Sequence, residues 1–222
     1  MWTISCGPVQ SPAAKMCGAL VGVKTEGTRI VANELMQTSA PHIFAAGDCT
    51  GPHEIVHIAI QQGETAVHNM IKPKSPRRMD YRLLLSVVFT EPQVATVGLT
   101  EKTARENKIL FLAASYPFND HGKSLIMEAK DGFVKLLANP QTGEIIGGSC
   151  VGPSGGELIH EIVTAMAKRM TVRELAVMPH YHPTLGPTQA PPMISPVFGF
   201  ASSFTKPSFA SMMSDLPWSL NG

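Results

Sequence analysis

Apolar and polar positions divide the chain into two patterned stretches, separated by a polar break at residues 72–80 (KPKSPRRMD). In the first stretch, the apolar run at 42–46 predicts a buried strand that ends in a loop at Gly47-Asp48. From Glu54 to Ile71 apolar residues recur at helical spacing, which predicts a helix of roughly four to five turns. The break contains prolines, as is typical of a domain boundary.

The second stretch begins at Tyr81 and mixes short strands with helices. Thr100 is a typical N-cap residue, and Asp131-Gly132 is a typical turn between strands. Strands are predicted at 83–90, 94–99, 109–118, 124–129, 132–139 and 144–152, and helices at 100–107, 156–170 and 172–178. This order predicts an α+β fold in which helices cover an antiparallel sheet.

The two ends lack periodicity. Residues 28–35 hold a short strand-like patch, but residues 1–20 are predicted to be irregular, and residues 186–222 contain six prolines and only two charged residues. We therefore predict four segments. They are an irregular start (1–19), a first patterned domain (20–78), a second domain (79–185) and a loose Pro/Ser-rich tail (186–222).

Composition narrows the function classes. The net charge is +1, so no basic surface for nucleic acid is expected. No apolar run is long enough to span a bilayer, and the N-terminus lacks a signal-peptide pattern, so we expect a cytoplasmic protein without membrane contact. The spacings of its four cysteines, Cys6, Cys17, Cys49 and Cys150, match no metal knuckle and no CxxC pair.

The loop after the predicted strand 42–46 is a candidate ligand site. In open α/β sheets ligands bind beyond the carboxyl ends of strands, where the N-terminus of the next helix offers unpaired N–H groups. Asp48 could accept hydrogen bonds from a polyol there, or it could only cap the turn that follows.

Residues 38–48 add a motif to this loop, because Thr38, Ile43-Phe44-Ala45 and Gly47-Asp48 form a T-x-x-x-x-I-F-A-x-G-D string. This string resembles the second FAD-binding motif of the pyridine nucleotide–disulfide oxidoreductase family. Three later strings resemble the family's interface (dimerisation) domain and its terminal catalytic stretch. They are VVFTEPQVATVGLTE (87–101), GFVKLLANPQTGEIIGGSCVGPSGGELIHEI (132–162) and PHYHPTL (179–185). The resemblance covers roughly residues 20–185 and is strongest to dihydrolipoamide dehydrogenase-like members.

The resemblance implies a partial FAD site. Asp48, following Gly47, would bind the ribityl chain, and the backbone N–H groups of Ile55, Val56 and His57 would face the pyrimidine edge of the flavin. FAD is therefore the implied cofactor, with NAD or NADP bound elsewhere in a full-length parent. The fold expected is an antiparallel-sheet dimerisation domain, preceded by a remnant of an α/β FAD-binding domain.

The same resemblance makes His182 the catalytic base that exchanges a proton with a substrate thiol, a task that suits an imidazole near neutral pH. The family's orienting glutamate, five residues later, is replaced by Pro187, and no glutamate follows Glu174. His180, His182, His160 and Glu161 fit no standard zinc spacing, so no metal site is expected.

Three family features are absent from the sequence: a G-x-G-x-x-G fingerprint for FAD, a second one for NAD, and a C-x-x-x-x-C disulfide. We therefore expect a C-terminal fragment, truncated or frame-shifted, that is inactive alone. Its parent would pass electrons between a dihydrolipoamide-type dithiol, FAD and NAD, and would form a homodimer. The alternatives are a non-catalytic homodimerisation module, or a fragment of a mercuric reductase, glutathione reductase or soluble transhydrogenase relative.

Overall fold

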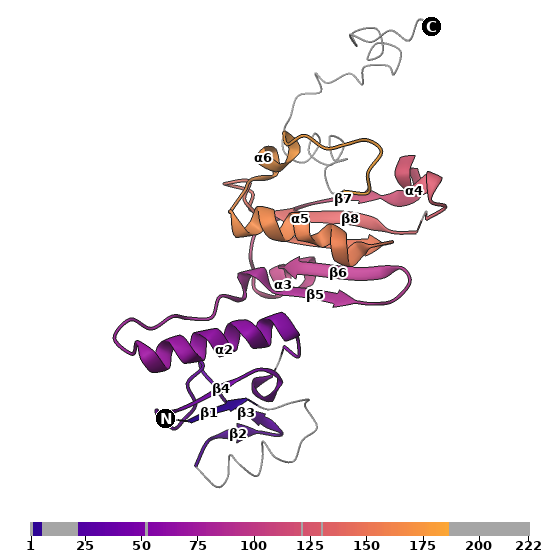
Figure 1. Ribbon diagram of the computed structural model, residues 1–222. Helices are drawn as coiled ribbons and strands as arrows, with labels where there is room; N and C mark the ends of the chain where they lie inside the picture. Colours follow the sequence, from indigo (N-terminus) through magenta and orange to yellow (C-terminus); the bar gives the residue numbers. More distant parts are fainter. Residues whose placement is uncertain (1, 6–21, 52, 121, 130, 187–222) are drawn as a thin grey trace, which may run out of the picture. The chain divides into compact units, whose positions relative to one another are not determined.

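The computed structural model describes residues 22–51, 53–120, 122–129 and 131–186, and the backbone of residues 2–5. The chain forms two compact units that divide between Ser86 and Val87 (Figure 1). Unit 1 contains β1 Trp2–Ser5, β2 Thr25–Glu26, β3 Arg29–Ile30, β4 Ile43–Ala46, the 3-10 helix η1 Asp48–Thr50, helix α2 Val56–Ile71 and the 3-10 helix η2 Tyr81–Leu83. No helix among the described residues is long and apolar enough to cross a bilayer.

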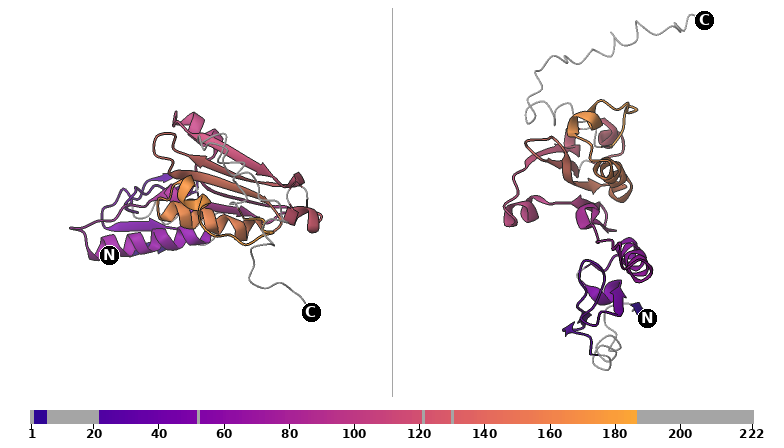
Figure 2. Two further views of the ribbon diagram at one scale, coloured as in Figure 1. Left: turned by 90° about the horizontal axis from the view of Figure 1, so that it is seen from above. Right: turned by 90° about the vertical axis from the view of Figure 1, so that its left-hand side faces the viewer.

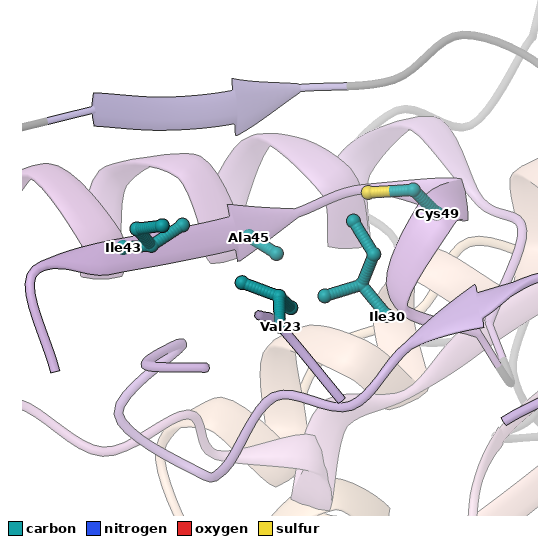
Figure 3. Close-up of a cluster of buried hydrophobic side chains, with 5 residues drawn as sticks. All are labelled: Val23, Ile30, Ile43, Ala45 and Cys49. Atoms are coloured by element: carbon teal, nitrogen blue, oxygen red, sulfur yellow. The ribbon is translucent and has the colours of Figure 1, made fainter. Parts of the chain in front are cut away.

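Strand β4 is buried on both faces, which explains its unbroken apolar sequence. Ile43 and Ala45 point to a cluster with Val23, Ile30 and Cys49 (Figure 3). On the opposite face, Phe44 packs with Met36 and with Ala66 of α2. The Gly47-Asp48 loop follows β4 directly, so the packing of β4 also fixes the position of the loop.

The N-terminal prediction was wrong for residues 2–5. They form strand β1, which pairs in parallel with β4 from Trp2↔Ile43 to Ser5↔Ala46. Gln37 also bridges Phe44 in antiparallel fashion, so β4 has backbone neighbours on both sides. Local periodicity could not reveal β1, because four residues carry too few alternations and the pairing partner lies about 40 positions later. The predicted tail covers residues 186–222, and all of it except Gly186 lies outside the described residues.

The polar break is fastened to unit 1. The Asn69 side chain donates to the carbonyl oxygens of Leu35 (2.9 Å) and Arg77 (2.8 Å), and its Oδ1 accepts from Arg77 N at 2.7 Å. Met79 N donates to Glu34 O at 2.8 Å. The side chains of residues 72–78 are exposed, but the backbone at Arg77 and Met79 is held by unit 1.

Unit 2 contains the predicted antiparallel sheet, whose strand order is β5-β6-β9-β8-β7. The strands are β5 Leu85–Val88, which begins just before the division, β6 Gln93–Gly98, β7 Leu112–Pro117, β8 Phe133–Ala138 and β9 Ile145–Gly152. The helices are α3 Glu101–Glu106, α4 Gly122–Ile126, α5 Gly155–Ala167 and α6 Val172–Ala176, with the 3-10 helix η3 Phe118–Asp120. Helix α5 lies along one face of the sheet, against β9 and β6 (Figure 2).

Most of the predicted elements of unit 2 are confirmed, and the helix starts follow local chemistry. Thr100 caps α3 and Thr171 caps α6, each with a reciprocal capping box. The strand predicted at 124–129 is wrong, because Gly122–Ile126 forms helix α4. Leu125, Ile126 and Met127 are all exposed, so this apolar run is not part of the buried core. The Ser124 hydroxyl holds the helix by donating to Phe118 O.

Candidate functional site

The Gly47-Asp48 loop lies at the carboxyl end of β4, where β4 runs parallel to β1. The turn is closed by Thr50, whose N and Oγ1 both donate to Gly47 O at 2.9 and 2.8 Å. Gly47 has φ 85°, a left-handed backbone value that favours glycine. The Asp48 carboxylate does not cap this turn, and within the described ranges no hydrogen bond or ion pair engages it.

A buried glutamine holds the loop to α2. Gln62 is only 1% exposed, and its Oε1 accepts from Gly47 N at 2.7 Å. Its Nε2 donates to the Tyr81 hydroxyl at 2.9 Å. The helical pattern places Gln62 on the buried face of α2 but does not show what it binds. In the sequence, the sign of this contact is a polar glutamine at a position that the helical pattern buries.

Helix α2 begins just beyond the loop. Ile55 is its N-cap and makes no side-chain cap, so the first-turn N–H groups, including those of Val56 and His57, have no partner within the helix. The His57 Nε2 atom lies 3.1 Å from Leu85 O. His53 precedes the helix beside the Tyr81 ring, and partial burial lowers the pKa of His53. The structure thus places Gly47, Asp48, Ile55, Val56 and His57 on one continuous loop and helix start.

The second group of predicted residues lies in unit 2, after α6. His182 is exposed, whereas the residues that follow it, Thr184 and Leu185, are buried. His180 is half-buried, and its Nε2 lies 2.8 Å from Oε1 of Glu161 on α5. Its Nδ1 lies 2.7 Å from Met178 O. Sequence reasoning did not predict this pair, because Glu161 and His180 are nineteen residues apart.

Cys150 on β9 is fully buried. Burial, and secondarily the charge of Glu161, raise the pKa of the Cys150 thiol to about 12. Cys49 is also buried, and its Sγ donates to Ala46 O at 3.4 Å. Neither cysteine has the electropositive, accessible surroundings of a redox thiol. In the described part of the chain, no three His, Cys, Asp or Glu side chains come together as a metal-binding group.

This raised pKa predicts a loss of stability at alkaline pH. The unfolded chain releases the Cys150 proton near pH 8.5, whereas the folded chain holds it to about pH 12, so the folded state binds more protons in between. The free energy of unfolding should fall by up to about 1.4 kcal/mol per pH unit above about pH 9. Urea titrations from pH 7 to 10.5 of the chain and of Cys150→Ala measure this effect. The slope should be smaller in Cys150→Ala, and equal slopes would contradict the assignment.

The two units correspond to a piece of a nucleotide-binding domain and to a dimerisation-type α+β domain. Comparison with known protein families gives the same division. Residues 3–63 match the model "Pyridine nucleotide-disulphide oxidoreductase", and residues 84–191 match "Pyridine nucleotide-disulphide oxidoreductase, dimerisation domain". The chain belongs to the pyridine nucleotide-disulphide oxidoreductase family. The match begins at residue 3, which corrects the expectation that the similarity starts near residue 20 and agrees with the presence of β1.

Curated relatives support the same assignment. The chain is 36% identical over 166 residues to dihydrolipoyl dehydrogenase of Mycobacterium leprae, covering 74% of this chain and 36% of the relative. It is 37% identical over 186 residues to that of Synechocystis, covering 78% of this chain and 39% of the relative. The chain therefore spans little more than a third of the length of these relatives.

Solved structures show the same fold. LpdA from Mycobacterium tuberculosis matches with a TM-score of 0.69 at 30% identity, over 76% of this chain and 37% of that protein. The flavoprotein disulfide reductase RclA from Escherichia coli matches with a TM-score of 0.64 over 76% of this chain and 39% of that one. At 22% identity the latter supports the fold alone.

Proposed function

We propose that this chain is the C-terminal part of an FAD-dependent NAD(P)H–disulfide oxidoreductase most similar to dihydrolipoyl dehydrogenase. The observation that carries the proposal is the β4–loop–α2 unit. In it the half-buried carboxylate of Asp48, which has no partner among the described residues, follows β4 in the loop that leads to α2. The names of the relatives supply the class of reaction. The parent's disulfide substrate would be a lipoyl group or a similar small-molecule disulfide.

The residues of the loop fit part of a flavin cofactor. The Asp48 carboxylate can accept hydrogen bonds from the hydroxyls of a ribityl chain, and Gly47 allows the left-handed turn before it. The N–H groups of Ile55, Val56 and His57 would stabilise negative charge on a flavin ring at the helix N-terminus. Bound FAD would supply two-electron transfer between a dithiol and a nicotinamide. No residue of this chain is assigned to NAD or NADP.

His182 would act as the base of the parent enzyme. Its exposed imidazole can take a proton from a substrate thiol and return it later, since an imidazole changes charge near neutral pH. The match to the dimerisation-domain model supports a homodimer, whose interface would be self-complementary. A non-catalytic homodimerisation module is the second candidate. It is favoured by unit 2, whose five-stranded sheet and α5 form a core of their own.

Replacement of Asp48 tests the cofactor site. We expect purified chain to bind added FAD and Asp48→Ala to bind it about tenfold or more weakly, because hydrogen bonds to a charged group are among the stronger ones. Equilibrium titration, followed by the flavin absorbance that co-elutes from a sizing column, measures both binding and oligomeric state. Glu64→Ala, an exposed carboxylate on α2, is the matched control and should bind like the original chain.

The elution profile separates the two candidate functions. Flavin that co-elutes with the chain but not with Asp48→Ala would support the oxidoreductase assignment. A colourless dimer would favour the dimerisation module. Equal flavin binding by the original chain and Asp48→Ala would contradict the role assigned to this carboxylate.

A further inference from the structure

The segment from His180 to Gly186, which carries His182, bends around the carboxylate of Glu161. The Oε1 atom lies 2.8 Å from His180 Nε2 at one end of the segment. At the other end, a Cβ atom built on Gly186 would lie 3.3 Å from Oε2. Glu161 therefore lies next to both arms of the bend that carries His182. Near the end of the segment, Gly186 N donates to Thr184 Oγ1 at 3.0 Å.

The protons of this contact follow from the partners of His180. Met178 O can only accept, so His180 Nδ1 must donate to it. The other nitrogen faces a carboxylate oxygen, so it is satisfied when it also carries a proton, or when Glu161 itself is protonated and donates. In either case one proton is held between Glu161 and His180. The contact is thus a charge-assisted or acid–base hydrogen bond, which is stronger and more directional than a neutral one.

The surroundings of Glu161 make this contact specific. The side chains of His180 and Glu161 are only 19% and 28% exposed, so solvent screens them less than a surface pair. Glu161 stands on α5, whose neighbouring residues Ile159 and Ile162 are fully buried against the sheet. Glu161 is therefore fixed to the core of unit 2, whereas the segment His180–Gly186 that it contacts forms no helix or strand.

We propose that Glu161 is a positioning residue for His182, acting through His180. It fixes the direction of the His180–Gly186 bend from α5, so that the imidazole of His182 is presented in one orientation. The position five residues after His182 is Pro187, which has no carboxylate. The carboxylate that contacts this segment is that of Glu161 on helix α5. The catalytic meaning of this role rests on the proposed function, but the contact and its effect on the segment do not.

A double-mutant cycle on the full chain tests the proposal. Glu161→Gln keeps the shape of the side chain but removes its charge, and His180→Gln removes one of the two donors. We expect each variant to speed amide hydrogen exchange at Gly186, whose N–H donates to Thr184 Oγ1, by about tenfold or more. If Glu161 acts through His180, the double variant should exchange no faster than either single variant. Glu157→Gln, an exposed glutamate one turn earlier on α5, should exchange like the original chain.

A spectroscopic reading separates positioning from general stability. In ¹⁵N-labelled chain, the His180 ring should give a protected Nε2–H signal that is lost in Glu161→Gln, while amides of β8 and β9 keep their exchange rates. Unchanged exchange at Gly186, or additive effects in the double variant, would overturn the proposal. If Glu161→Gln loses the ring signal but the original chain binds no FAD, the positioning contact is supported and the proposed function is not.

Discussion

Gly147→Ala should cost unit 2 about 3 kcal/mol of unfolding free energy or prevent its folding, because among the described glycines an added Cβ meets its nearest atom at the shortest distance here. Gly147 lies on β9, opposite Gly98 of β6 and Leu137 of β8. A Cβ atom there would lie 2.0 Å from the carbonyl oxygen of Leu99. Leu99 belongs to the backbone that leads into α3, so no rotation of a side chain can relieve the overlap.

To relieve this overlap the Leu99 backbone would have to move, and its contacts with β9 and with α3 would break. Leu99 N donates to Ile146 O at 3.0 Å, and the next residue, Thr100, is the N-cap of α3. Displacing Leu99 therefore strains the strand end and the capping box together. Urea unfolding followed by circular dichroism measures the change. Gly122→Ala is the matched control, because a Cβ atom at Gly122 meets nothing within 4 Å, and its midpoint should stay near that of the original chain. Equal midpoints for the two variants would show that the Leu99 backbone can move away from Gly147 at little cost.

Gln62→Leu should destabilise unit 1 by about 2–3 kcal/mol. Leucine fills a similar volume, but it leaves the buried Gly47 N–H without its acceptor and removes the donor to Tyr81. A buried donor left unpaired costs its full desolvation free energy. The loop that carries Asp48 loses its attachment to α2, so FAD binding should weaken as well.

Hydrogen exchange localises this effect. The Gly47 amide should exchange much faster in Gln62→Leu, while amides of β8 and β9 in unit 2 should be unchanged. The neighbouring glutamine, Gln61, is exposed on the same helix, so Gln61→Leu is a closely matched control with an expected change within about 0.5 kcal/mol. A Gly47 amide that stays protected in Gln62→Leu would show that the loop is held by other contacts.

Sequence patterns predicted the elements that owe their form to local chemistry. Helix α3 follows from the Thr100 cap, and β4 follows from an apolar run that is buried on both faces. The patterns failed where a distant partner decides the structure. Strand β1 forms by pairing with β4, and Leu125–Met127 were predicted as strand although Gly122–Ile126 forms helix α4.

In the candidate sites, too, the local residues were predictable and their distant partners were not. The Gly47-Asp48 loop and the His182 segment were found from their residues and from family resemblance. The partners that hold them were not found, because Gln62 and Glu161 contact residues fifteen and nineteen positions away. A side chain that anchors a loop in this way has no spacing rule, and only the folded arrangement reveals it.

The fastening of the polar break has a consequence for how the chain could be divided or lengthened. Its composition suggests a flexible connector into which extra residues could be inserted at little cost. However, the backbone at Arg77 and Met79 forms hydrogen bonds with Asn69 and Glu34 of unit 1, and Tyr81 binds Gln62 beneath the candidate flavin loop. A chain ended at residue 72 would therefore lose the support of that loop. An insertion is better tolerated in the exposed turn at Pro73–Ser75 than at residues 77–81.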